Sequence, residues 1–89
     1  MSGDKLRTSI GLAIIGCGDI GKARAEFARM YPAVEWIGVC DVNLDLATLL
    51  AEEIHADFVT NDVSELLSRS ELNAVIIATN ETAHFIPIS

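Results

Sequence analysis

The chain has 89 residues, of which 51% are hydrophobic and 21% charged, and its formal net charge is −7 because 13 acidic residues outnumber 6 basic ones. This composition excludes a disordered or collagen-like chain, and the length suffices for one small domain. The negative charge argues against a surface for nucleic acid or anionic membranes, and no apolar run reaches the roughly 18–20 residues of a membrane-spanning helix.

The first nine residues, MSGDKLRTS, are polar and include an acid. They lack the apolar region of a signal peptide, so we expect a disordered leader on a cytoplasmic protein whose folded part is residues 10–89. Cys17 and Cys40 do not have the spacing of metal ligands, and no metal site is predicted. We interpret both cysteines as free, small, semi-buried thiols.

A glycine-rich motif follows the first apolar segment, residues 10–15 (IGLAII), which has the length and composition of a buried parallel strand. The motif is Gly16-x-Gly18-x-x-Gly21, and a segment with helical spacing continues from it. The first glycine permits a tight turn, the second lets the backbone approach a pyrophosphate, and the third lets the helix pack on the strand. The helix N-terminus then faces the phosphates. The predicted cofactor-binding residues here are Gly16, Cys17, Gly18, Asp19, Ile20 and Gly21.

The next segments alternate between helical and strand patterns. The apolar face predicted for the first helix comprises Ile20, Ala23, Phe27 and Met30. Tyr31-Pro32 ends that helix, because the residue before proline resists helical geometry. A second strand spans residues 34–40 (VEWIGVC), and Asn43 can cap a second helix. The side chains that repeat every four residues in the second helix are Leu46, Leu50 and Ile54.

The second half of the chain continues this alternation. Residues 57–60 (DFVT) form a short third strand, and Asp62 with Glu65 resembles a capping box that opens a brief third helix. Residues 74–79 (AVIIAT) form a buried fourth strand, and residues 83–89 are expected to begin a further helix. The sequence therefore predicts an α/β fold: a partial Rossmann, doubly wound parallel sheet in strand order 3-2-1-4 with flanking helices.

Asp41 directly follows the second strand and lies twenty residues beyond Gly21. An acid at this point can accept hydrogen bonds from both hydroxyls of an adenosine ribose. Its charge would repel a 2′-phosphate by a few kcal/mol at an effective dielectric constant of about 20. Val42 and Asn43 offer no cation or hydroxyl to such a phosphate, so NAD is predicted in preference to NADP. Asp19 suits a helix N-terminus but opposes a bound pyrophosphate.

Four stretches together resemble the N-terminal domain of the glucose-fructose oxidoreductase / inositol dehydrogenase (Gfo/Idh/MocA) family. They are AIIGCGDIG, GVCDVN, the ELL run at residues 65–67 and NAVIIATNETAH. In that family the fourth strand ends in a Thr-Pro-x-x-x-His-like segment beside the cofactor. The resemblance therefore implies cofactor-side roles for Thr79, for Asn80, which stands in place of the proline, and for His84.

The resemblance also implies hydride transfer between NAD and an alcohol carbon of a sugar or polyol. Family members continue into a fifth strand with a catalytic lysine and then a substrate domain, which this sequence lacks. We therefore expect an incomplete domain that is not catalytically competent alone, assign no catalytic residue, and predict a substrate only for a full-length parent. An unpaired fourth-strand edge would favour homodimerisation across it.

Two other functions stay open from the residues alone. A non-catalytic nucleotide-binding or sensing module would retain the three glycines and Asp41 without any lysine for chemistry. An S-adenosylmethionine-dependent methyltransferase also uses a glycine loop and an acid after its second strand. The short glycine motif and the immediate transition from strand to helix favour the dinucleotide.

Overall fold

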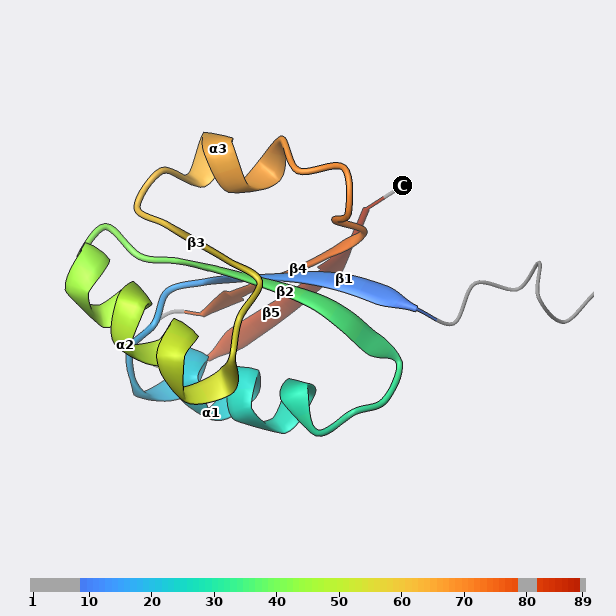
Figure 1. The fold of residues 1–89 in the computed structure, drawn as a ribbon, viewed down its shortest axis with the longest axis horizontal. Helices are drawn as coiled ribbons and strands as arrows, with labels where there is room; N and C mark the ends of the chain where they lie inside the picture. Colours follow the sequence, from blue (N-terminus) through green and yellow to red (C-terminus); the bar gives the residue numbers. More distant parts are fainter. Residues whose placement is uncertain (1–8, 79–81, 89) are drawn as a thin grey trace, which may run out of the picture.

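The computed structural model describes residues 9–78 and 82–88, which form a five-stranded sheet in the order β3-β2-β1-β4-β5 with three helices (Figure 1). The elements are β1 (Ile10–Ile15), α1 (Asp19–Arg29), β2 (Val34–Cys40), α2 (Leu44–Ile54), β3 (Phe58–Thr60), α3 (Val63–Leu67), β4 (Ala74–Ala78) and β5 (Ala83–Pro87). Of the predicted leader, residues 1–8 lie outside the described residues.

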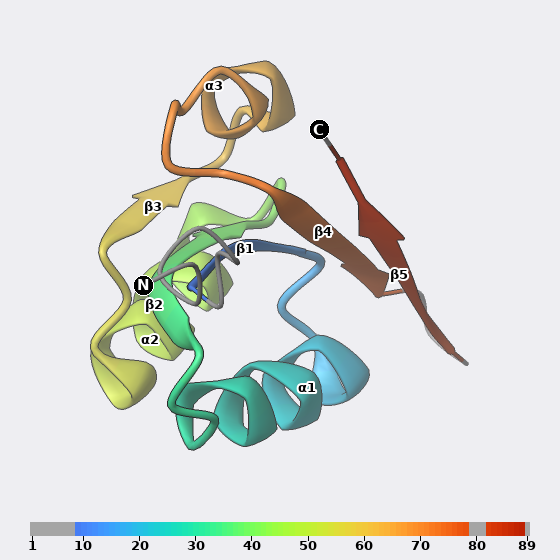
Figure 2. The same ribbon diagram turned by 90° about the vertical axis from the view of Figure 1, so that its right-hand side faces the viewer.

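The central four strands confirm the predicted parallel order 3-2-1-4. β1 pairs in parallel with β2 and with β4, and β2 pairs in parallel with β3. Helices α1 and α2 cover one face of the sheet and α3 covers the other (Figures 1 and 2). Because both faces are covered, the β1 residues Ala13 and Ile14 are both fully buried although they point to opposite sides.

The C-terminal segment was predicted as a helix, and that prediction is wrong. Residues 83–87 form β5, which pairs antiparallel with β4 and places His84 opposite Ile77. The open edge of β4 offers unpaired N–H and C=O groups, and the extended segment satisfies them. Pro87 ends this edge strand, a position that tolerates the missing N–H. The free β4 edge on which the dimer hypothesis rested is therefore occupied by β5.

The buried face of α1 also differs from the predicted one. Phe27 and Met30 are 69% and 76% exposed, whereas Gly21 and Ala25 are buried. Helix α1 approaches the sheet so closely that its contact face must be made of small residues: a Cβ at Gly21 would lie 1.7 Å from the Gly16 carbonyl oxygen. Ala28, one turn after Ala25, packs against the same core.

Both predicted helix caps are present. The Asn43 side chain accepts hydrogen bonds from Asp45 N and Leu46 N at the start of α2. Asp62 caps α3: its Oδ1 accepts from the Ser64 hydroxyl at 2.7 Å and from Ser64 N at 3.0 Å, and these two bonds lower the pKa of its carboxyl. In a complete capping box the Glu65 side chain would accept from the Asp62 amide. Here Thr60 lies between these two groups. The Asp62 amide donates to Thr60 Oγ1, while the Thr60 hydroxyl donates to Glu65.

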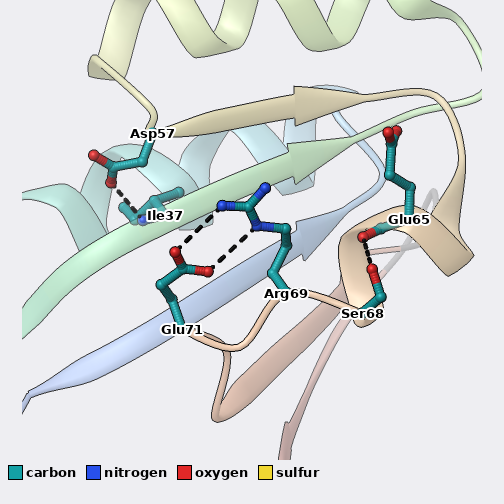
Figure 3. A network of polar contacts seen from close by, with 6 residues as sticks. All are labelled: Ile37, Asp57, Glu65, Ser68, Arg69 and Glu71. Atoms are coloured by element: carbon teal, nitrogen blue, oxygen red, sulfur yellow. Dashed lines mark hydrogen bonds and ion pairs between the residues drawn. The ribbon is translucent and has the colours of Figure 1, made fainter.

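Hydrogen bonds of charged side chains stabilise the connections between helices and strands (Figure 3). On one side Asp57 Oδ2 accepts from Ile37 N at 2.9 Å and pairs with Arg29 at 3.7 Å. On the other, Arg69 lies 4.6 Å from the Phe58 ring centroid and forms two hydrogen bonds with Glu71, which lower the pKa of that carboxyl. These contacts tie the connections to the neighbouring strands.

Arg29 joins the two helices of the same face. Its Nε donates to the Ile54 carbonyl at 2.9 Å and its Nη2 to the His55 carbonyl at 3.2 Å, at the end of α2 where carbonyls lack helical partners. His55 takes the left-handed conformation there, with φ 55°. The arginine thus caps α2 from α1.

We predict that Arg29→Met lowers the free energy of unfolding by about 1.5–3 kcal/mol, because two charge-assisted hydrogen bonds to the last carbonyls of α2 are lost. Urea denaturation followed by circular dichroism measures this change. Arg24→Met, at an exposed position of the same helix, is the matched control and should change stability by less than about 0.5 kcal/mol. Equal effects of the two substitutions would contradict the capping role.

Candidate functional site

A cleft of about 300 Å³ lies at the carboxyl ends of β1 and β2, at the point where the chain order reverses between β1 and β4. Ligands of open parallel sheets bind at such a point. The residues that line it are Gly16, Gly18, Asp19, Ile20, Gly21, Asp41, Leu46 and Ala78. The fold therefore brings the three motif glycines together with Asp19, Ile20 and the strand-end acid.

The three glycines of the loop have different roles. Gly16 has φ 99°, a conformation that favours glycine, and a Cβ there would lie 2.5 Å from the Ala78 carbonyl oxygen. Gly21 is where α1 contacts the end of β1. Gly18 differs from both, because a Cβ there would meet no atom within 4 Å. The fold requires the first and third glycines, and the second faces open space in the cleft.

Helix α1 begins at this cleft with Gly18 as its N-cap. No described side chain caps that end, and the first intrahelical bond runs from Lys22 N to Gly18 O at 2.8 Å. The preceding N–H groups carry the partial positive charge of a helix N-terminus. Lys22 pairs with Glu53 of α2 at 3.5 Å. The backbone N–H groups at the start of α1 are therefore the donors that this end of the cleft offers to a ligand.

Asp41 faces the glycine loop across the cleft and is half-buried. Its Oδ2 accepts a hydrogen bond from Cys17 N at 2.8 Å, and its Oδ1 accepts one from Asn43 N at 2.9 Å. Each carboxylate oxygen has a second lone pair, so both oxygens retain capacity for a ligand hydroxyl. The arrangement can accept hydrogen bonds from a vicinal diol.

Cys17 lies beneath the loop and not in the cleft. Its side chain is 6% exposed, and Sγ donates to the Cys40 carbonyl at 3.4 Å. Burial, and then the Asp41 charge, raise the pKa of the Cys17 thiol to about 12, and burial likewise raises the pKa of Cys40. Both cysteines are free, as predicted, and both are protonated near neutral pH. Neither thiol has the lowered pKa typical of a reactive cysteine. The residues that line the cleft do not include Cys17.

Three predicted site residues remain: Thr79, Asn80 and His84. Thr79 and Asn80 lie outside the described residues. His84 is exposed on β5, separated from β1 by β4, and does not line the cleft. Among residues 9–78 and 82–88, no cluster of three potential ligands could hold a metal ion, and no helix is long and apolar enough to span a membrane.

Leu46 lines the cleft, although its spacing predicted a core position. Its side chain is 40% exposed, whereas Ala47 and Leu50 are buried. The other two residues of the predicted stripe, Leu50 and Ile54, are buried as expected. Ala47, which also has helical spacing with them, takes the buried position in place of Leu46. Leu46 therefore gives the cleft an apolar wall beside Asp41.

Comparisons with known proteins agree with this geometry. A model of the Gfo/Idh/MocA family, described as an oxidoreductase family with an NAD-binding Rossmann fold, matches residues 10–89. A crystal structure of GenD2 from gentamicin A biosynthesis, in complex with NAD, is 31% identical to this chain and has a TM-score of 0.75. The alignment covers 80% of this chain and 20% of the GenD2 chain. No curated protein matches.

A second similar structure is a mutant of KijD10, a 3-ketoreductase from Actinomadura kijaniata in complex with TDP-benzene and NADP. It is 29% identical with a TM-score of 0.64, and the alignment covers 75% of this chain and 21% of that chain. This chain thus spans about a fifth of the length of the two solved structures.

We predict opposite stability effects at two glycines of the loop. Gly21→Ala should lower the free energy of unfolding by several kcal/mol, because its Cβ would overlap the Gly16 carbonyl oxygen. Gly18→Ser, the matched control, should leave stability unchanged or raise it by up to about 1 kcal/mol, because serine caps a helix N-terminus well. Chemical denaturation measures both. A Gly21→Ala protein as stable as wild type would refute the close contact.

The Cys17 thiol should make stability fall at alkaline pH. Because its pKa is raised in the folded chain, its contribution is fully present below the unfolded value near 9 and is lost as pH rises toward about 12. Denaturation at pH 8 and pH 10.5 should show this loss, and Cys17→Ala should reduce it. An identical pH dependence in Cys17→Ala would show that other groups cause it.

Proposed function

This chain belongs to the Gfo/Idh/MocA oxidoreductase family, with an NAD-binding Rossmann fold, and we propose that it holds NAD in the cleft between the glycine loop and Asp41. The open space at Gly18 carries the proposal. Packing excludes a side chain at Gly16 and Gly21, but the fold leaves room for one at Gly18. A glycine there serves a ligand that approaches the backbone closely.

The N-terminus of α1 supports a pyrophosphate at this position. The uncapped N–H groups after Gly18 and the positive end of the helix dipole favour an anion, and Asp19 is exposed at the rim. The ribose of the adenosine half then lies toward Asp41, whose oxygens accept from its hydroxyls. Leu46 supplies an apolar surface beside the acid. The residues present thus fit the dinucleotide.

The charge of Asp41 favours NAD over NADP. A 2′-phosphate about 4 Å from the carboxylate would be repelled by about 4 kcal/mol at an effective dielectric constant near 20. The two similar structures contain NAD in one case and NADP in the other, so the preference rests on this chain's own residues. Val42 and Asn43, next to Asp41, provide neither a cation nor a hydroxyl for the phosphate.

The reaction proposed for the oxidoreductase is hydride transfer at an alcohol carbon of a sugar or polyol. Bound NAD supplies the hydride acceptor, and this chain's residues bind and orient the cofactor. Since no residue of the chain is assigned to catalysis, we expect the 89 residues alone to bind NAD without turning over such an alcohol.

Calorimetry with NAD, NADP and S-adenosylmethionine tests the proposal. We expect NAD to bind at least tenfold more tightly than NADP, and S-adenosylmethionine not to bind. Gly18→Ser should weaken NAD binding at least tenfold while the protein stays folded, because its side chain fills the space that the pyrophosphate needs. Asp45→Asn, at an exposed acid of α2, is the control and should bind like wild type.

Two results would overturn the proposal. Binding of S-adenosylmethionine alone would favour the methyltransferase alternative. Undiminished NAD binding by Gly18→Ser would place the dinucleotide outside the cleft.

A further inference from the structure

Both oxygens of the Asp41 carboxylate are engaged within the protein. One holds Cys17 N of the glycine loop at 2.8 Å, and the other holds Asn43 N ahead of α2 at 2.9 Å. These donors belong to two connections that are far apart in the sequence. Hydrogen bonds of backbone N–H groups to a charged acceptor are stronger than neutral ones. The carboxylate therefore joins the glycine loop to the start of α2.

Other hydrogen bonds hold the glycine loop at its strand end and at its helix end. Cys17 is flanked by Gly16 and Gly18, residues whose backbone has the most conformational freedom. Gly16 N donates to the Cys40 carbonyl at 2.8 Å, and the Cys17 thiol donates to the same oxygen at 3.4 Å. On the helix side, Gly18 O accepts the first intrahelical hydrogen bond of α1, from Lys22 N at 2.8 Å. The hydrogen bond from Cys17 N to Asp41 lies between these two anchored ends of the loop.

We propose that Asp41 is a positioning residue for the pyrophosphate half of the site, in addition to the ribose role, and this inference rests on the proposed function. By fixing the Cys17 amide, the carboxylate holds Gly18 and the first turn of α1 where their N–H groups meet the phosphates. Asn43 extends the same connection to α2, since its side chain caps that helix.

Charge and positioning predict opposite effects on anion binding. A carboxylate close to the phosphates repels them, so its removal strengthens anion binding if charge alone matters. If the carboxylate positions the loop, its removal weakens anion binding although a negative charge is lost. The sign of the change therefore distinguishes the two roles.

This coupling also bears on cofactor specificity. A substitution of Asp41 that removes the repulsion of a 2′-phosphate also removes the hydrogen bond to Cys17 N. The glycine loop that binds the pyrophosphate then loses this restraint. Asp41→Ser should consequently lose NAD affinity without a matching gain in NADP affinity. Cofactor preference in this chain would then depend on the loop as well as on the charge beside the ribose.

The first test needs no ligand. Amide hydrogen exchange of Cys17 should be at least tenfold faster in Asp41→Ala than in wild type, whereas the Ile37 amide, bonded to Asp57, keeps its protection. Asp41→Asn retains one acceptor oxygen and should give an intermediate rate. Asp45→Ala is the charge-matched control. Equal Cys17 exchange rates in wild type and Asp41→Ala would overturn the proposal.

The second test uses inorganic pyrophosphate, which has no ribose, in a titration followed by NMR of the loop amides. We expect affinity to fall at least threefold in Asp41→Ala, to recover in part in Asp41→Asn, and to stay unchanged or rise in Asp45→Ala. Equal or tighter binding by Asp41→Ala would overturn the proposal.

The two tests separate this inference from the proposed function. Wild-type protein that binds pyrophosphate in an Asp41-dependent way but not NAD would refute the function and support the positioning role. NAD binding together with pyrophosphate binding that does not depend on Asp41 would support the proposed function and refute the positioning role. If pyrophosphate binds too weakly to measure, the exchange rate of the Cys17 amide decides the question.

Discussion

The close contact between α1 and the end of β1 is the constraint on which the site depends. With only a hydrogen at Gly21, the helix passes so near the Gly16 carbonyl that any side chain would overlap it. The contact makes the helix start three residues after the loop's first glycine and directs its N-terminus into the cleft. It also explains why small residues face the sheet while Phe27 and Met30 point outward. The packing of α1 and the position of the proposed phosphate site therefore share one geometric cause.

The proposed phosphate site lies in a chain whose net charge is −7. Lys22, at the edge of the loop, forms an ion pair with Glu53. In our proposal, backbone N–H groups and the helix dipole attract the phosphates, and their effect is confined to the first turn. Asp41 lines the same cleft and would accept from hydroxyl donors. The proposed site thus places a phosphate and a diol at separate positions.

The sequence predicted the core of the fold well because its signals are local. Continuous apolar runs marked the strands, and Asn43 and Asp62 marked the helix starts. β5 could not be foreseen in this way, since a short apolar segment is compatible with helix or strand and the free edge of β4 decided the outcome. The α1 face was wrong for a related reason. Hydrophobicity ranks Phe27 above Gly21, but the helix-to-sheet distance selects the smaller residue.

The candidate site was predictable in composition but not in the role of each residue. Spacing placed Asp41 beside the glycine loop, yet only the structure shows Cys17 buried beneath it and Leu46 beside the acid. The same distinction applies within the motif. A chain with this fold but no nucleotide would still need Gly16 and Gly21, because packing excludes their substitution. It would not need Gly18, where a side chain fits without contact. Of the three glycines, Gly18 is therefore the one whose presence argues for a ligand.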